Sequence, residues 1–303
     1  MYQKKLLKGY LMVLLSGVLF GCMALITTHI DGKAVTRETV VLLRNALALP
    51  ILGFMAFREQ KTLKIPLKTL PSIGILAVMG CCVTPLLLYK SYGYIQSGTA
   101  TVFHFVYPAV VVILNFLFLR KGVKWNTGLA VSVCVVGICL FYDPSQPLNW
   151  TGCSFALISG VTYAIYILLL SLLKKGTVSG FQLSFYIGFA STVVMLGYCL
   201  ISGTLTIPST VRDWILCAVL ALLINAGAVV LFQQGTFIVG SERAAILSTM
   251  EPLTGFVIGA AFMGEFLGRG SAYILRSVLG AILVIGASIL IAVFDIKDGK
   301  TTE

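Results

Sequence analysis

The stretch Gly9-Tyr-Leu-Met-Val-Leu-Leu-Ser-Gly-Val18 has a close counterpart later in the chain, Gly152-Cys-Ser-Phe-Ala-Leu-Ile-Ser-Gly-Val161. Five of the ten positions are identical, and the two stretches start 143 residues apart (152 − 9 = 143). Both are apolar, and so is the chain around them: 58% of the 303 residues are hydrophobic, 11% are charged and the mean hydropathy is +0.98. A soluble domain has about 45–50% apolar and about 25% charged residues, so this composition excludes a water-soluble globule and an intrinsically disordered chain.

Further matches between the two parts of the chain follow in the same order. The pattern Gly93-x-x-x-x-Gly98 is repeated as Gly235-x-x-x-x-Gly240, and Pro108 is repeated as Pro252. One match of this kind would be chance, but an ordered series at nearly constant offset is not. The sequence therefore predicts an internal repeat with halves at about 1–146 and 147–303.

The apolar runs are long enough to cross a bilayer. About 20 apolar residues in a helix span a hydrocarbon core of about 30 Å, and backbone groups in lipid must bond internally, which favours helices. The alternating pattern of a transmembrane β-barrel is absent from the sequence. We predict ten transmembrane helices at about 9–30, 37–57, 70–89, 97–119, 125–142, 151–173, 180–201, 212–233, 243–263 and 274–294.

Lysine and arginine residues between the predicted spans indicate the orientation, because cytoplasmic loops of membrane proteins carry an excess of them. Fifteen fall on the side of the N-terminus: Lys4, Lys5, Lys8, Arg58, Lys61, Lys64, Lys68, Arg120, Lys121, Lys124, Lys174, Lys175, Arg243, Lys297 and Lys300. Six fall on the other side: Lys33, Arg37, Lys90, Arg212, Arg269 and Arg276. Both termini are therefore predicted to be cytoplasmic. The net charge of +11 is interpreted as membrane anchoring rather than nucleic-acid binding.

Each predicted half holds five spans, and an odd number makes the second half enter the membrane from the opposite side. The predicted fold class is thus an all-α integral membrane protein of ten transmembrane helices, built as two inverted five-helix repeats. Inverted repeats are typical of secondary transporters, whose substrate site lies near the bilayer midplane between the repeats. They are less expected of a receptor or a membrane enzyme.

Several motifs extend this interpretation to a family. They are the Ser16-Gly17 and Ser159-Gly160 pairs, the Gly-then-Pro pattern of the fourth and ninth spans, Glu251-Pro252, and Gly264-Glu265. In these features the chain resembles the drug/metabolite transporter superfamily, in its ten-helix form with two EamA domains, over nearly its whole length. Arg120-Lys121 stands where the family often has Gly-Glu. The resemblance implies a carrier in a bacterial inner membrane that exports amino acids, other metabolites or toxic compounds, although some family members import metabolites.

The fourth and ninth spans carry polar stripes around their prolines. Pro108 and Pro252 each remove a backbone hydrogen bond near the middle of a span, so they are candidate hinges or, equally, packing kinks without a functional role. Polar groups in a bilayer tend to face the bundle interior or a water-filled path. Helical spacing puts these candidates on the two faces: His104, Tyr107 and Asn115 in the fourth span, Ser248 and Glu251 in the ninth.

Three ionisable residues inside the spans are candidates for coupling or substrate binding. Glu251 is the deepest carboxylate; a lone carboxylate in low dielectric tends to take up a proton, so it could couple transport to a proton gradient. Its alternative role is structural, as a group that bonds the backbone beside Pro252. His104 could bind substrate or carry protons, because imidazole titrates near neutral pH, or make one interhelical hydrogen bond. Arg44 could pair with Glu251 or a substrate carboxylate, or extend to the membrane surface.

Tyr163 and Tyr166 in the sixth span are candidates for the wall of a substrate pocket, although such residues more often fill the bundle or face lipid. The chain has no G-x-x-x-x-G-K-[ST] phosphate loop and no potassium-channel filter sequence, which argues against an ATP-driven pump in itself and against such a channel. Two histidines are too few for a multi-histidine metal site. No metal and no other cofactor is therefore predicted.

The sequence thus favours a secondary active transporter of small metabolites over an enzyme. Its expected partners are a small-molecule substrate, membrane lipid and protons as coupling ion, and its oligomeric state is left open. One alternative is a nucleotide-sugar or sugar-phosphate exchanger, which would need more buried basic charge than Arg44. Others are a membrane-embedded enzyme, for which we find no nucleophile–base pair, and a lipid scramblase, which would need a polar track open to lipid.

Overall fold

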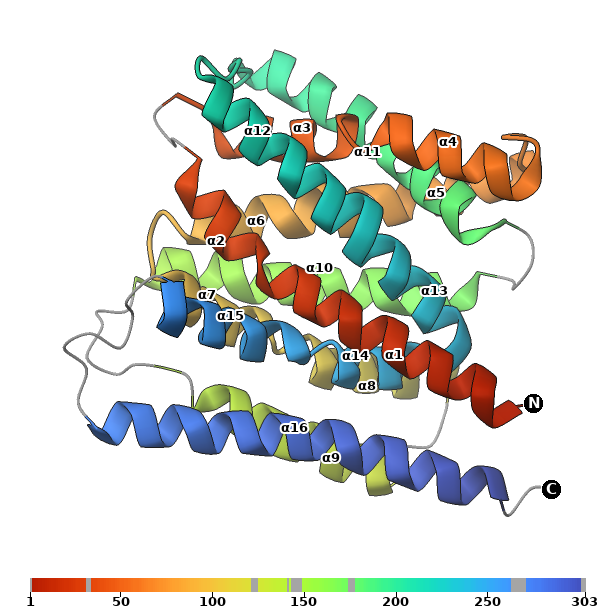
Figure 1. Ribbon diagram of the computed structural model, residues 1–303, viewed down its shortest axis with the longest axis vertical. Coiled ribbons are helices and arrows are strands. Elements are labelled where there is room, and N and C mark those ends of the chain that lie inside the picture. Colours follow the sequence, from red (N-terminus) through yellow and green to blue (C-terminus); the bar gives the residue numbers. More distant parts are fainter. Residues whose placement is uncertain are drawn as a thin grey trace.

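The computed structural model describes residues 2–30, 34–120, 125–140, 142, 149–173, 178–262 and 271–300. Every regular element among these residues is a helix, and the helices run side by side in one bundle (Figure 1). The predicted all-α membrane fold is therefore confirmed.

The ten predicted spans all coincide with helical segments. In the first half these are α1 (Tyr2–Gly21) with α2 (Met23–His29); α3 (Arg37–Ala46) with α4 (Leu49–Gln60); η1 (Leu67–Thr69), α5 (Leu70–Leu76), η2 (Ala77–Val83) and α6 (Thr84–Ser91); α7 (Ser97–His104) with α8 (Tyr107–Leu119); and α9 (Trp125–Cys139). In the second half they are α10 (Trp150–Leu172); α11 (Gly180–Ser202); α12 (Val211–Leu220), η3 (Ala221–Val229) and α13 (Val230–Val239); α14 (Ser241–Leu247) with α15 (Met250–Phe262); and α16 (Ser271–Lys300).

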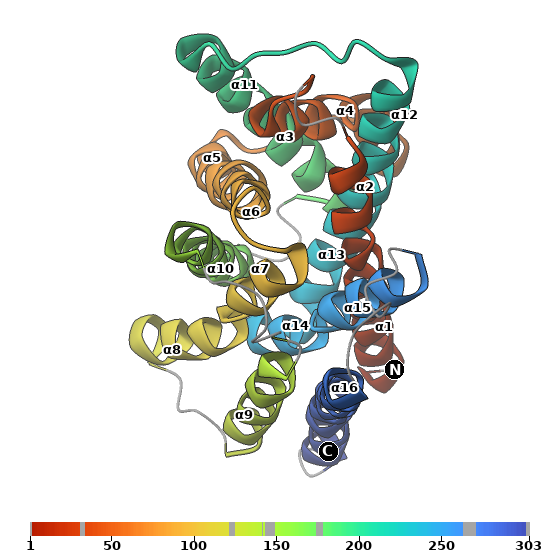
Figure 2. The same ribbon diagram turned by 90° about the vertical axis from the view of Figure 1, so that its left-hand side faces the viewer.

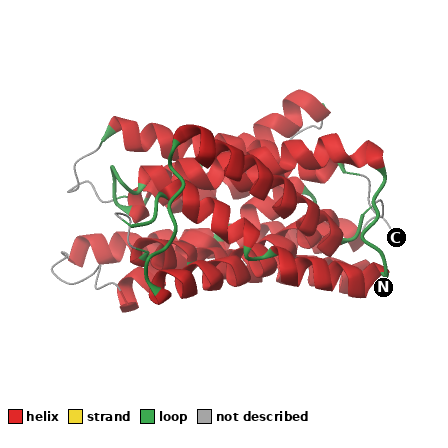
Figure 3. Ribbon diagram, turned by 90° about the horizontal axis from the view of Figure 1, so that it is seen from above, coloured by secondary structure: helices red, strands yellow, loops and turns green. Residues whose placement is uncertain are grey.

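Most of these segments meet the requirements of a membrane span. Within the described part of the chain, eight helical stretches are long and apolar enough to cross a bilayer, and α9 is a shorter apolar helix. The remaining predicted span is interrupted between α14 and α15. Tyr2 at the start of α1 and Lys300 at the end of α16 lie at the same end of the bundle (Figures 1 and 3), as an even number of crossings requires.

Side chains in the connections define where several spans begin. Thr36 accepts a hydrogen bond from the backbone N–H of Thr39 at the start of α3, and Asn149 caps α10 in the same way. At α11, Ser179 and Gln182 form a reciprocal capping box. Such caps satisfy backbone N–H groups that the first helical turn leaves unpaired, which explains why these helices start at these residues.

The helices pack in a pattern that is the same for both halves. Along one edge of the bundle α9 lies against α16, and at the opposite edge α11 lies against α3 and α4 (Figure 2). Between these edges, α1 packs against α13 and α15. Its counterpart α10 packs against α6 and α8, the matching helices of the other half. The first helix of each half thus packs against the equivalent helices of the other half.

Both halves also interrupt their helices at matching places. The π-helical segments η2 and η3 begin at Ala77 and Ala221, 144 residues apart (221 − 77 = 144). The ends of α7 and α14, at His104 and Leu247, are 143 residues apart (247 − 104 = 143). These agreements support the division into repeats at 1–146 and 147–303, which we retain as a proposal. The boundary itself, like Gly264-Glu265, lies outside the described residues.

Candidate functional site

Two pockets lie inside the bundle and meet at Glu251. The first chamber, with about 720 Å³ of empty space including its opening, is lined by Phe20, Gly21, Met23, Ala24, Leu25, Tyr92, Ser97, Thr101, Val102, Glu251, Pro252, Gly255, Phe256, Ile258 and Tyr273. The second chamber, with about 500 Å³, is lined by Phe20, Met23, Arg44, Gly80, Cys81, Thr84, Pro85, Leu88, His104, Tyr163, Tyr166, Val229, Phe232 and Glu251. Phe20, Met23 and Glu251 belong to both walls, so these three side chains separate the chambers.

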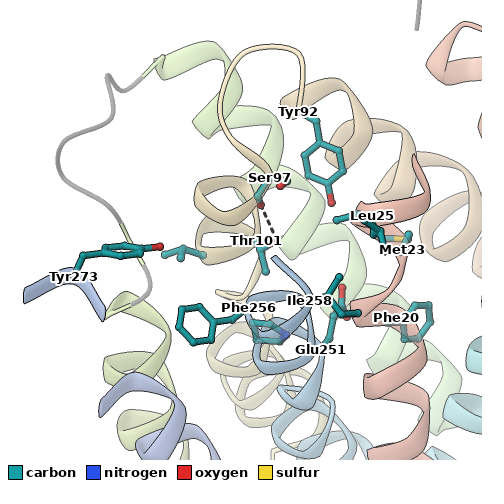
Figure 4. A pocket seen from close by; sticks show the side chains of 15 residues that line it. Phe20, Met23, Leu25, Tyr92, Ser97, Thr101, Glu251, Phe256, Ile258 and Tyr273 are labelled. Atoms are coloured by element: carbon teal, nitrogen blue, oxygen red, sulfur yellow. Dashed lines mark hydrogen bonds between the residues drawn. The ribbon is translucent and has the colours of Figure 1, made fainter. Parts of the chain in front are cut away.

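The first chamber lies toward the end of the bundle opposite the termini. The last turn of α6 and the first turn of α7 lie at that end (Figure 1). Tyr92 directly follows α6, Ser97 starts α7, and both line the chamber. In Figure 4 the hydroxyl of Tyr92 points into the chamber, on the side of Leu25 and Glu251. This chamber therefore gives Glu251 a route toward that end of the molecule.

Glu251 is the second residue of α15, directly after the interruption that follows α14. Its carboxylate makes no hydrogen bond or ion pair with any residue that the structure describes. Glu251 is thus a free acidic group between two chambers, rather than a member of a closed hydrogen-bond network.

Arg44 lies in the wall of the second chamber and is buried, with 3% of its surface exposed. Its Nη1 donates to the hydroxyl of Tyr89 at 2.8 Å and lies 3.7 Å from the sulfur of Met23. The guanidinium also lies over the Tyr89 ring, 5.9 Å from its centroid. Arg44 therefore points inward rather than to the membrane surface, and it forms no ion pair with Glu251.

Aromatic rings of α7, α10 and α13 line the second chamber, and Tyr107 of α8 packs against them without lining it. The ring of Tyr163 lies 4.9 Å from Tyr107, 5.6 Å from His104, 5.8 Å from Tyr166 and 5.8 Å from Phe232, between ring centroids. Four of the predicted site residues are thus brought together in one cluster. The packing of flat rings gives this wall a large apolar surface with few polar groups.

His104 is held by a side chain of the sixth span. Its Nδ1 lies 2.8 Å from the hydroxyl of Ser159, which itself donates to the carbonyl of Ala156 at 2.6 Å. Because the Ser159 proton is used there, the ring N–H of His104 is the donor of this hydrogen bond. His104 is therefore oriented by α10 while its ring lines the second chamber.

Polar contacts join the fourth and ninth spans at their interruptions and also toward the end of the bundle that holds the termini. The hydroxyls of Tyr107 and Ser248 lie 2.5 Å apart. The amide of Asn115 donates to the carboxylate of Glu242 at 2.9 Å and to the hydroxyl of Ser241 at 3.1 Å. Asn115 is thus a contact between α8 and α14, and it does not line either chamber.

The two prolines lie just inside the second segment of each interrupted span. Pro108 is buried in the first turn of α8, and Pro252 lines the first chamber. Each lacks the N–H that would bond the carbonyl four residues earlier. A Cβ at Gly160 would overlap the His104 carbonyl oxygen, and one at Gly17 would lie 3.2 Å from that of Ser248. The predicted Ser-Gly pairs therefore pack directly on the two interruptions.

Sequence reasoning missed several residues that shape the site. Gly80 and Phe232 line the second chamber, and Glu242 anchors Asn115. Gly80 and Phe232 are neither charged nor part of a repeated motif, so no pattern singles them out. Glu242 lies next to the predicted boundary of a span, where an acidic residue is ordinary. Among the described residues, no group of three or more His, Cys, Asp and Glu could hold a metal ion.

Comparisons with known proteins bear on the role of this site. A family model described as the EamA-like transporter family matches residues 7–142. A relative from Archaeoglobus fulgidus, named "Uncharacterized transporter", is 28% identical over 89% of this chain and 95% of its own length. The "Uncharacterized inner membrane transporter YicL" of Salmonella typhimurium is 23% identical over 94% and 95% of the two chains. A solved crystal structure has the same fold, with a TM-score of 0.72 at 13% identity, over 94% of this chain and 96% of that chain.

Proposed function

We propose that the chain is a secondary active carrier that exports a small molecule through the two chambers. The match of residues 7–142 to the EamA-like transporter family and the relatives named as transporters support this proposal. Amino acids and toxic compounds are the first cargoes to test. The proposal places both termini in the cytoplasm and the protein in a bacterial inner membrane, as the name of the Salmonella relative indicates for that protein.

The observation that carries this proposal is the position of Glu251. It is the one carboxylate that lines both chambers, and no other described residue pairs with it. A substrate or a proton that passes from one chamber to the other must pass Glu251, Phe20 and Met23. An ionisable group at such a point can respond to both sides of the membrane in turn.

The helix interruptions are the positions at which the proposed carrier bends. In this structure Asn115–Glu242 holds α8 against α14 toward the end of the bundle with the termini, and Tyr107–Ser248 joins the two spans at their interruptions. The first chamber lies toward the opposite end. We propose that this arrangement is the outward-facing state, and that the inward-facing state breaks these contacts by bending at the interruptions beside Pro108 and Pro252. Alternating access of this kind is usual for inverted-repeat carriers.

Glu251 would then be the coupling group. In a low-dielectric site an ionised carboxylate without a partner is costly, so binding and release of a proton can accompany each change of access. His104 and Tyr163 line the substrate side of this point in the second chamber. We propose that they contact the cargo and that Glu251 exchanges protons.

The test uses purified protein in liposomes with an imposed pH gradient and a panel of radiolabelled amino acids. We expect Glu251→Gln to remain folded, because the amide has the same shape as the carboxyl group. The variant should lose uphill, pH-dependent transport and keep exchange of cargo at equal concentrations. If it still concentrates its cargo with unchanged pH dependence, Glu251 is structural and the proposed coupling is wrong.

A matched control is Glu59→Gln at the exposed end of α4, which removes a carboxylate without touching either chamber. It should transport as the unchanged protein does. Loss of uphill transport in both variants would point to a general effect of surface charge rather than to Glu251.

A further inference from the structure

Arg44 carries a buried positive charge for which the described residues offer no negative partner. Among the residues that the structure describes, its buried Nε has no hydrogen-bond partner, and its polar contacts are the Tyr89 hydroxyl and the Met23 sulfur. Among the described residues the one ion pair joins Lys90 to Glu38. An unpaired buried charge is costly, so a protein that keeps one in a membrane bundle has a use for it.

Three aromatic rings in the wall of the same chamber are stacked on one another. The rings of Tyr163 and Tyr166 are inclined by 13°, those of Tyr166 and Phe232 by 22°, and those of Tyr163 and Phe232 by 30°. The three rings and Arg44 all line the second chamber. A ligand in this chamber therefore meets both the Arg44 guanidinium and these aromatic rings.

Glu251 does not neutralise Arg44, although both line the second chamber. The two side chains form no ion pair. The empty space of the chamber, counted together with its opening, is about 500 Å³. Arg44 is thus available to an anionic group that enters from outside the protein.

We propose that Arg44 binds the carboxylate of a small monocarboxylic acid whose flat apolar body lies against Tyr163, Tyr166 and Phe232. A guanidinium forms paired hydrogen bonds with carboxylates and phosphates alike. The carboxylate is favoured because Arg44 is the one arginine or lysine in the described chamber wall, whereas a phosphate brings up to two negative charges.

Tyr89 acts as a positioning residue in this site. Its hydroxyl accepts from Arg44 and its ring lies below the guanidinium, so Tyr89 keeps the cation at the chamber wall. The assignment of a ligand class rests on the proposed function, because the chamber matters as a path for cargo. Binding itself, however, can be measured without transport.

The test is direct binding to the full-length protein in lipid nanodiscs, with benzoate, phenylacetate and 3-phenylpropionate, each compared with its uncharged amide. Hydrogen bonds to a charged group contribute enough for a roughly tenfold or larger preference for the acid. Arg44→Met should abolish this preference. Its fold should persist, because the substitution removes a buried charge that the protein leaves unpaired. Tyr89→Phe should weaken binding of the acids by a smaller factor.

Arg58→Met at the exposed end of α4 is the matched control and should bind as the unchanged protein does. Any one of three results would overturn the proposal. They are equal binding of acids and amides, failure of all three acids to bind at millimolar concentrations, and unchanged acid binding in Arg44→Met. If Arg44→Met does not fold, two other measurements test the proposal. They are the preference of the unchanged protein for acids over amides and the weaker acid binding expected of Tyr89→Phe. Acid binding without transport in liposomes would refute the proposed function alone, and transport of uncharged cargo without acid preference would refute this inference alone.

Discussion

The hydroxyl of Tyr107 lies 2.5 Å from the hydroxyl of Ser248, and this contact joins the two halves of the chain at their helix interruptions. Tyr107 is the first residue of α8, and Ser248 directly follows α14. Ser248 also donates to the carbonyl of Ala245 at 3.0 Å, so the Tyr107 hydroxyl is the donor between them. One buried hydrogen bond thus connects the two segments that the transport cycle is proposed to separate.

Removing either partner should destabilise this structure by different amounts. Tyr107→Phe removes the donor and should cost about 1 kcal/mol, whereas Ser248→Ala leaves the buried Tyr107 hydroxyl without an acceptor and should cost about 1–3 kcal/mol. The double variant should cost less than the sum of the two single changes, because the residues share one contact. Melting temperatures of the four proteins in detergent measure this coupling. Strict additivity would show that the two hydroxyls do not interact in the folded protein.

Asn115→Ala should loosen the closed end of the bundle. The change removes the hydrogen bonds from Asn115 to Glu242 and Ser241, and loss of about 1 kcal/mol from one state shifts its population roughly fivefold. The readout is maleimide labelling of Thr101→Cys in the first chamber, with the more accessible Cys22 and Cys139 replaced by serine. Labelling should slow in Asn115→Ala.

Ser132→Ala on the exposed face of α9 serves as its control and should leave the rate unchanged. An unchanged rate in Asn115→Ala as well would mean that the Asn115–Glu242 contact does not hold the bundle closed.

Gly160→Ala should destabilise the protein because the new methyl group would collide with the His104 carbonyl oxygen. A backbone atom cannot move aside without shifting the interruption between α7 and α8, and overpacking of this kind costs about 1–3 kcal/mol. Gly197→Ala in α11 is the matched control, since a Cβ there meets no atom within 4 Å. We expect a lower melting temperature for the first variant alone. Equal melting temperatures would show that α10 can move away from the interruption.

The two termini should be cytoplasmic. The lysine and arginine residues of the connections lie mostly on the side of the N-terminus, and Tyr2 and Lys300 share one end of the bundle. A fluorescent reporter fused after Glu303 should be active in the cytoplasm, and Gln146→Cys should react with an impermeant reagent added outside the inner membrane. A C-terminal reporter that is active only outside the cytoplasm would reverse the predicted topology.

Hydropathy was sufficient to predict the ten spans because lipid imposes one requirement, an apolar helix of sufficient length, on each of them. The inward direction of Arg44 could not be predicted in this way. Its position near the start of the second span allows the side chain to reach either the surface or the interior. The hydroxyl of Tyr89, 45 residues later in the chain, accepts its hydrogen bond and determines the outcome.

The candidate site was predictable where a polar or ionisable residue stood inside an apolar run. Glu251, His104 and Tyr163 line the second chamber. The same reasoning placed Asn115 on a chamber-facing stripe, whereas it bonds to Glu242 at the boundary of two helices. Helical periodicity assigns a face to a residue, but the tilt of each helix and its neighbours decide whether that face meets a cavity or another helix.

The π-helical segments η2 and η3 bear on the history of the chain. A π turn closes its hydrogen bonds over one more residue than an α turn does, so each segment accommodates a residue that a plain helix would not. The two segments start 144 residues apart, close to the spacing of the other matches between the halves. If the halves descend from one duplicated ancestor, the simplest account is a single insertion in that ancestor. The wide turn was then already present when an ancestral five-helix protein had to pair with a second copy of itself, and both copies have kept it.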